Sequence, residues 1–178
     1  MKTYISIITL FFCAVVNAQS ANQSNTALSS KAMEAFSHKA ETKAEEFYNY
    51  LQLLSDTSVN NEMKLHTANE IRKLFTETEV SIANVYSASG TGITLDKLLE
   101  NALSAKQKNT FTIKGFTAKP IQQTSEKQQW LLSYEVSVNG SKYFRIDQDF
   151  FIIYENKKFG NTVKPVWNTY LGKSKMQQ

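Results

Sequence analysis

Two aspartates and one histidine are the residues of this sequence best suited to acid–base chemistry. Asp147 and Asp149 lie two positions apart, and His66 is one of two histidines in the chain. A carboxylate paired with a histidine or a tyrosine can move protons at neutral pH when its surroundings adjust its pKa. These three residues are therefore the catalytic candidates, with Tyr134 as the candidate phenolic partner.

Their expected places in the fold argue against that role. Side chains of a strand alternate between two faces, and on the strand expected around residues 144–154 the even-numbered positions are the more apolar. If that face covers helices, Asp147 and Asp149 point away from the pocket as surface charges, with Arg145 as their same-face neighbour. Four candidate ligand-binding residues then face inward: Trp130, Tyr134, Gln148 and Tyr154. None of them is a general base at neutral pH, so the pattern favours a non-catalytic role.

Metal and cofactor motifs are also missing from the sequence. His66 has no histidine or carboxylate at the spacing of metal ligands. The loop with Gly90 and Gly92 lacks the lysine and the serine or threonine that would grip a phosphate. Cys13 is the only cysteine. The sequence therefore predicts neither a metal site nor a cofactor.

The first 18 residues predict export. A lysine is followed by an apolar run and by small or aliphatic residues at Val16 and Ala18, which is typical of a cleaved signal peptide. A membrane anchor would need roughly 20 mostly apolar residues, so no transmembrane span is expected after cleavage. A lipoprotein signal at Cys13 remains an alternative, although Phe12 before it is not a small residue. We expect a periplasmic or secreted protein with a disordered leader over 19–30.

The charge of the chain is mild. The formal net charge is +4, and lysines are interspersed with glutamates without a block of one sign. Nucleic-acid binding usually requires a clustered basic surface. A nucleic-acid partner is therefore not expected.

Hydrophobic periodicity predicts one domain over 31–172 and a flexible tail over 173–178. Helices are expected at 31–55, from the Asn60 cap to about residue 75, and from the Thr94 cap to about residue 105. Strands are expected at 79–86, 110–118, 128–138, 141–154 and 162–171. The stretch 120–127 is expected to be a polar loop.

Three local signals refine the strands. Asn139-Gly140 between two alternating runs predicts a type I′ hairpin turn, because both positions tolerate positive φ. Gly115 predicts a bulge in the strand at 110–118. Pro165 has no amide hydrogen, so we place it where its strand lacks a neighbour or is bulged.

The order of these elements predicts an α+β fold with N-terminal helices on a strongly curved mixed or antiparallel sheet. Two helices with a break at 56–61, a strand at 79–86, a leucine helix at 95–103 and a long aromatic hairpin resemble the NTF2-like superfamily. That resemblance implies a cone with a mouth that can hold a small ligand. A cystatin-like sheet wrapped around a helix is the rival architecture.

Three functions follow from these expectations. The first is an exported binding or interaction domain that takes a small apolar ligand in the cone, or a protein partner or second copy on the outer sheet face. That face mixes Tyr143, Phe151 and Ile153 with charges, more apolar than solvent requires. The second is a small isomerase or hydrolyase using an aspartate with His66 or Tyr134. The third is a structural subunit of an envelope assembly.

Overall fold

The structure of the chain is a computed structural model that describes residues 29–77, 79–87 and 91–177. The expected signal peptide and nearly all of the expected leader lie outside these residues. The elements follow in the order α1 Ser30–Ser55, α2 Asn61–Lys73, β1 Ser81–Ala83, β2 Gly92–Thr94, α3 Leu95–Leu103, β3 Phe111–Gln123, β4 Lys127–Val138, β5 Phe144–Phe159 and β6 Thr162–Gln177.

The three helices begin where capping side chains satisfy free amide groups. Ser29, Asn60 and Thr94 each accept a hydrogen bond from the amide three residues later. The first amides of a helix have no partner within it, and these caps supply one. The caps predicted at Asn60 and Thr94 are confirmed, and α1 begins one residue earlier than expected.

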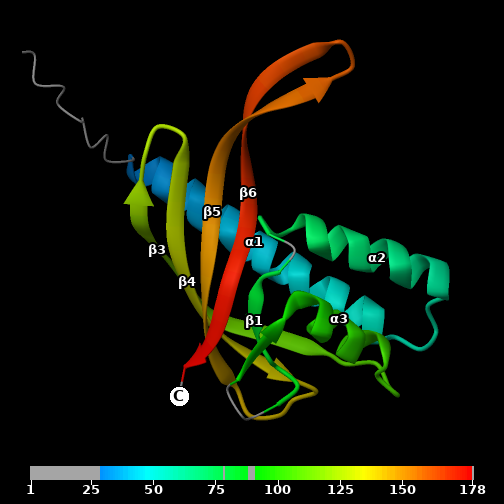
Figure 1. Ribbon diagram of the computed structural model, residues 1–178. Helices are drawn as coiled ribbons and strands as arrows, with labels where there is room; N and C mark the ends of the chain where they lie inside the picture. Colours follow the sequence, from blue (N-terminus) through cyan, green and yellow to red (C-terminus); the bar gives the residue numbers. More distant parts are fainter. Residues whose placement is uncertain (1–28, 78, 88–90, 178) are drawn as a thin grey trace, which may run out of the picture.

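The four long strands form one antiparallel sheet in the order β3-β4-β5-β6, so each strand pairs with its neighbour in sequence. Figure 1 shows α1 crossing one face of this sheet, with α2 and α3 beside it. We call the face that meets the helices the inner face. Buried aromatic and aliphatic side chains from both layers form a single core between them. The predicted α+β fold with helices on an antiparallel sheet is confirmed.

The hairpin signals were correct in detail. Asn139 and Gly140 have φ values of 54° and 69°, and the Ser141 amide donates to the Val138 carbonyl at 3.0 Å. This is the turn that the Asn-Gly pair predicted. The register of β3 against β4 also shifts between Lys114 and Thr117, which places the predicted bulge at Gly115.

Pairing with neighbouring strands lengthens three elements beyond their sequence signals. β5 continues from the expected end at residue 154 through Phe159. β3 continues through Gln123, so the polar loop expected at 120–127 shrinks to a three-residue turn. β6 continues through Gln177, so the expected flexible tail is strand over 173–177. Ser174 in this stretch also accepts a hydrogen bond from the Ala83 amide at 2.9 Å. These partners come from distant parts of the chain, which a local pattern does not reveal.

The hairpin of β5 and β6 extends past the helices and past the β3–β4 hairpin (Figure 1). We call residues 154–167 the arm; its strands stay paired from Tyr154 opposite Trp167 to Phe159 opposite Thr162. Closer to the body, the Leu171 amide of β6 donates to the Leu74 carbonyl at 2.7 Å. Pro165 lies in the part of β6 at the edge of the sheet, as its missing amide hydrogen predicted.

Within the described residues, no helix combines the length and the apolar character needed to cross a membrane.

Candidate functional site

A chain of hydrogen bonds crosses the middle of the core. The Tyr134 hydroxyl donates to Gln148 Oε1 at 2.7 Å, and Gln148 Nε2 donates to the Gly172 carbonyl at 3.4 Å. The Tyr48 hydroxyl of α1 lies 3.3 Å from that of Tyr134. Because Tyr134 has one hydroxyl hydrogen and it points to Gln148, Tyr48 is the donor in this pair. The polar groups that could have met a ligand therefore satisfy one another.

Burial makes both tyrosines poor acids. Desolvation raises the pKa of Tyr134 well above its ordinary value, and the neighbouring Tyr48 raises it further. Desolvation likewise raises the pKa of Tyr48. Each phenol stays neutral at physiological pH, so neither acts as a base there.

Aromatic side chains fill the inner face around these hydrogen bonds. Phe116 stacks on Tyr134 with ring centroids 5.9 Å apart, and Phe36 of α1 meets Trp130 edge-on at 6.1 Å. Trp130, Tyr134 and Gln148 are each 1% exposed. Three of the four candidate ligand-binding residues thus lie inward as expected and are enclosed by the protein's own side chains.

Tyr154, the fourth candidate, lies elsewhere. It continues the inner face of β5, but it is 45% exposed beside Trp167, with ring centroids 5.0 Å apart. The reason is the length of the hairpin, which carries Tyr154 beyond the helices that cover the rest of that face.

The two aspartates lie on the face away from the helices, as alternation predicted, but the expectation that they are surface charges was wrong. Asp147 and Asp149 are only 6% and 9% exposed. Ser133 donates to Asp147 Oδ1 at 2.7 Å and Gln177 donates to Oδ2, while Lys173 Nζ lies 3.9 Å from Asp149 Oδ2. Side chains of the flanking strands cover them, and a single-strand pattern cannot show this.

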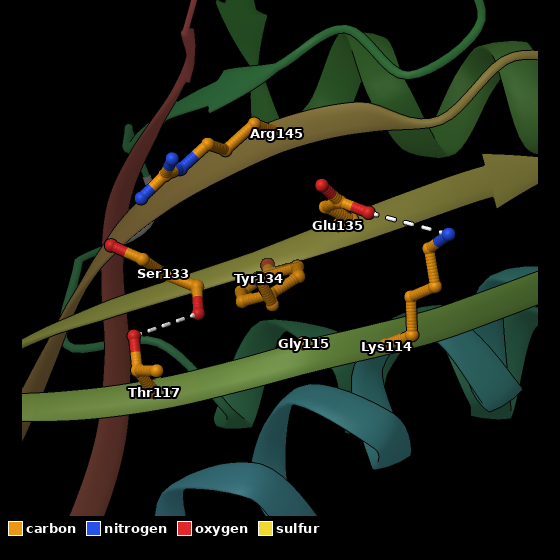
Figure 2. A pocket seen from close by; sticks show the side chains of 7 residues that line it. All are labelled: Lys114, Gly115, Thr117, Ser133, Tyr134, Glu135 and Arg145. Atoms are coloured by element: carbon orange, nitrogen blue, oxygen red, sulfur yellow. Dashed lines mark hydrogen bonds and ion pairs between the residues drawn. The ribbon is translucent and has the colours of Figure 1, made fainter.

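Arg145, expected as the aspartates' neighbour, forms an ion pair with neither carboxylate among the described residues. It instead borders a pocket of about 260 Å³ at the β3 bulge, which Figure 2 shows. We call this the bulge pocket; Lys114, Gly115, Thr117, Ser133, Tyr134 and Glu135 line the rest of it. Sequence reasoning did not find it, although the bulge that opens it was predicted from Gly115.

The polar groups of the bulge pocket are largely occupied. Lys114 Nζ lies 3.5 Å from Glu135 Oε2 and 3.6 Å from the centre of the Tyr143 ring. The Ser133 hydroxyl is committed to Asp147, and the Ser133 carbonyl accepts from Thr117 Oγ1 (Figure 2). A serine and an aspartate therefore touch here, but without a histidine to activate the hydroxyl they do not form a nucleophilic site.

His66 contacts neither of the two aspartates in the described structure. It is on α2 with a side chain 68% exposed, and its only ion-pair contact in the described chain is Glu70 at 3.9 Å. Glu70 lies four residues later on the same helix, so the expectation that no carboxylate stands at ligand spacing from His66 was wrong. The structure brings neither Asp147 nor Asp149 to it. No cluster of three or more histidine, cysteine, aspartate or glutamate side chains in the described residues could hold a metal ion.

One buried hydroxyl in the core is unsatisfied. Tyr86 Oη is buried and meets no hydrogen-bond partner among the described residues. Burial raises the pKa of Tyr86 to about 12. The Asn109 side chain approaches the hydroxyl and moderates that rise, but it does not meet hydrogen-bond geometry. Burying a hydroxyl without a hydrogen-bond partner costs free energy. The Tyr86 hydroxyl therefore lowers the stability of the fold.

The apolar residues expected on the outer sheet face are partly covered by the chain itself, although Tyr143 is still 36% exposed. Lys127 Nζ lies 4.4 Å from the centre of the Phe151 ring, and Lys114 covers Tyr143 in the same way. Phe151 and Ile153 are half-buried. The outer face is thus a weaker interaction surface than the sequence indicated.

The arm is a hairpin of two strands that carries four of the exposed large apolar side chains of the described structure. Every residue from 156 to 165 is exposed, so both faces of the arm meet solvent. Its exposed large hydrophobic residues, with their exposed fractions, are Tyr154 45%, Phe159 52%, Val163 60% and Trp167 39%. Sequence reasoning missed this surface, because the stretch between the strands expected at 141–154 and 162–171 was not expected to be strand.

An open groove of about 440 Å³ lies at the base of the arm, between the end of α2 and the outer sides of β5 and β6. Its carboxylate, Glu155, accepts hydrogen bonds from Asn168 and from Tyr170. These bonds lower the pKa of Glu155, so this carboxylate is an ionised structural group and a poor proton acceptor.

Comparisons with known proteins add little to this picture. No family model matches the chain, and no curated protein matches it significantly. Among solved structures, it resembles a protein from Novosphingobium aromaticivorans designated a scytalone dehydratase, with 9% identity and a TM-score of 0.37. The match covers 81% of this chain and 87% of that one. So low a similarity does not bear on activity.

The class of the protein follows from its own architecture. It is an α+β domain with helices on one face of a four-stranded antiparallel sheet.

Proposed function

We propose that this chain is a non-catalytic interaction domain of an exported protein and that it binds its partner through the arm. The observation that carries the proposal is a contrast in exposure. The inner face is closed around Tyr134 and Gln148, whereas the arm leaves Phe159 and Trp167 in solvent. Exposed aromatic side chains gathered on one element are typical of interaction sites.

The enzymatic alternative has less support. An isomerase or hydrolyase would need a carboxylate facing an apolar pocket with a free acid–base partner. Asp147 instead lies on the outer face and accepts from Ser133 and Gln177. His66 is exposed on α2 and contacts neither aspartate.

Cross-linking in the producing cells tests the interaction surface. The photoreactive residue p-benzoylphenylalanine would be placed at Phe159 in one variant and at Leu65, an exposed position on α2, in the matched control. We expect position 159 to yield cross-linked products, with a protein or with lipid, that position 65 does not give. Equal yields from both positions would refute the proposal.

Fluorescence tests the competing small-ligand function. The chain has two tryptophans, so Trp167→Phe leaves Trp130 in the core as the only reporter. We expect apolar ligands, tested as a panel of fatty acids and aromatic compounds, to leave Trp130 emission unchanged. Saturable quenching by one of them would show that a ligand enters the core beside Trp130. That result would favour the small-ligand function over an interaction through the arm.

A further inference from the structure

We propose that the partner of the arm is the anionic surface of a lipid bilayer. This inference rests on the proposed role of the arm as the binding surface. Three observations support it: the positive charge of the arm, the exposure of both its faces, and the spacing between the apolar residue at the tip and the lysines behind it.

The tip of the arm is basic. Residues 156–165 contain Lys157, Lys158 and Lys164 and no aspartate or glutamate. All three lysines are exposed, and none forms an ion pair with a described residue. Lysines near an anionic membrane each strengthen binding by about fivefold. An acidic surface is therefore the electrostatic complement of the tip.

The apolar residues are ordered for shallow insertion. Phe159 flanks the turn, and Val163 is paired with Lys158 one step behind it. The pair of Lys157 and Lys164 follows two steps behind Phe159, about 7 Å along the strand. Interfacial segments bury their apolar side chains about 5–10 Å deep. This spacing puts the lysines at headgroup level when Phe159 enters the lipid.

Exposure on both faces favours a lipid over a protein groove. Phe159 and Val163 belong to opposite faces of the hairpin, because they stand at successive cross-strand pairs. A groove on a protein partner would cover one of these faces. A lipid surface surrounds the tip and covers both.

A second copy of the chain fits the arm poorly. Two identical tips meeting around a twofold axis would bring six lysines together without a carboxylate, and like charges repel. Pro165 also removes a donor from the strand that would have to pair edge to edge. Self-association through the tip is therefore disfavoured.

Vesicle binding tests the proposal with the whole purified chain. We expect it to float with phosphatidylcholine vesicles that contain phosphatidylglycerol, and not with pure phosphatidylcholine. The triple change K157Q/K158Q/K164Q should weaken this binding about 100-fold, and added salt should weaken it further. The control K31Q/K106Q/K142Q removes the same charge from exposed lysines elsewhere and should change binding less than about fivefold.

A spectroscopic variant reports insertion directly. Trp167→Phe combined with Phe159→Trp puts a fluorophore at the tip, while Trp167→Phe alone reports Trp130 in the core. The anionic vesicles should shift the emission to the blue only in the double variant. Absence of the shift, or an equal loss of binding in both lysine triples, would overturn the proposal.

The two proposals fail in different ways. If the vesicles do not bind but position 159 cross-links to a protein or to a second copy, the lipid partner is wrong and the interaction function stands. If neither the vesicles nor the cross-link responds to the arm, both are wrong.

Discussion

Tyr134 donates a hydrogen bond of 2.7 Å to Gln148 between adjacent strands, where both side chains are 1% exposed. This pair is the centre of a hydrogen-bonded network inside the core. Because each partner is satisfied by the other, by Tyr48 or by the Gly172 carbonyl, this pair needs no ligand to complete its hydrogen bonds.

Tyr134→Phe should destabilise the fold. The change leaves the buried Gln148 Oε1 without its donor, and an unsatisfied buried acceptor costs about 1–3 kcal/mol. Urea unfolding followed by circular dichroism measures the free energy of unfolding. Tyr48→Phe is the matched control. It removes a donor at the end of this series of hydrogen bonds, so it should lower the free energy of unfolding by less. A Tyr134→Phe variant as stable as the wild type would contradict the assigned hydrogen bond.

Tyr86→Phe should have the opposite effect. The Tyr86 hydroxyl is buried without a partner, so removing it deletes a desolvation penalty and leaves the ring in place. We expect the free energy of unfolding to rise by about 1 kcal/mol. The same urea experiment reads this out. A loss of stability would mean that the hydroxyl is bonded in solution.

Alkaline pH should unfold the protein through its buried tyrosines. Burial raises the pKa of Tyr86 to about 12 and that of Tyr134 well above its ordinary value of 10.0. A folded pKa above the unfolded one gives stability that is complete below pH 10 and is lost as pH rises through the folded pKa. The free energy of unfolding should therefore fall from about pH 10 upward.

Urea titrations across this pH range measure the effect, with Tyr86→Phe as the control. Removing one raised group should make the decline shallower by about 1.4 kcal/mol for each pH unit between the unfolded and folded pKa values of Tyr86. An identical pH profile for both proteins would show that Tyr86 titrates normally.

Gly172→Ala should disrupt the outer face. A Cβ at this position would lie 2.6 Å from Phe151 Cε2 and 2.9 Å from Asp149 Cβ. Overpacking of this kind costs about 1–3 kcal/mol. Phe151→Leu should recover part of the loss in the double variant, because it removes the closer contact. Additive costs of the two changes in thermal unfolding would argue against this contact as the cause.

Local chemistry determined much of this fold from sequence. The caps at Asn60 and Thr94, the Asn139-Gly140 turn and the bulge at Gly115 each depend on backbone conformations and donors within a few residues. Alternation also placed Asp147 and Gln148 on opposite faces of β5 correctly. These features depend only on neighbours along the chain, so the sequence was sufficient to determine them.

The tertiary structure alone decided what covers each face. Asp147 is buried because Ser133 and Gln177, on the two flanking strands, reach it. Tyr154 is exposed because β5 outruns the helices, although its face is the inner one. Burial depends on how long each element is and on which distant element lies over it. A pattern within one strand contains neither quantity, and so the closed core and the exposed arm emerged only from the packed chain.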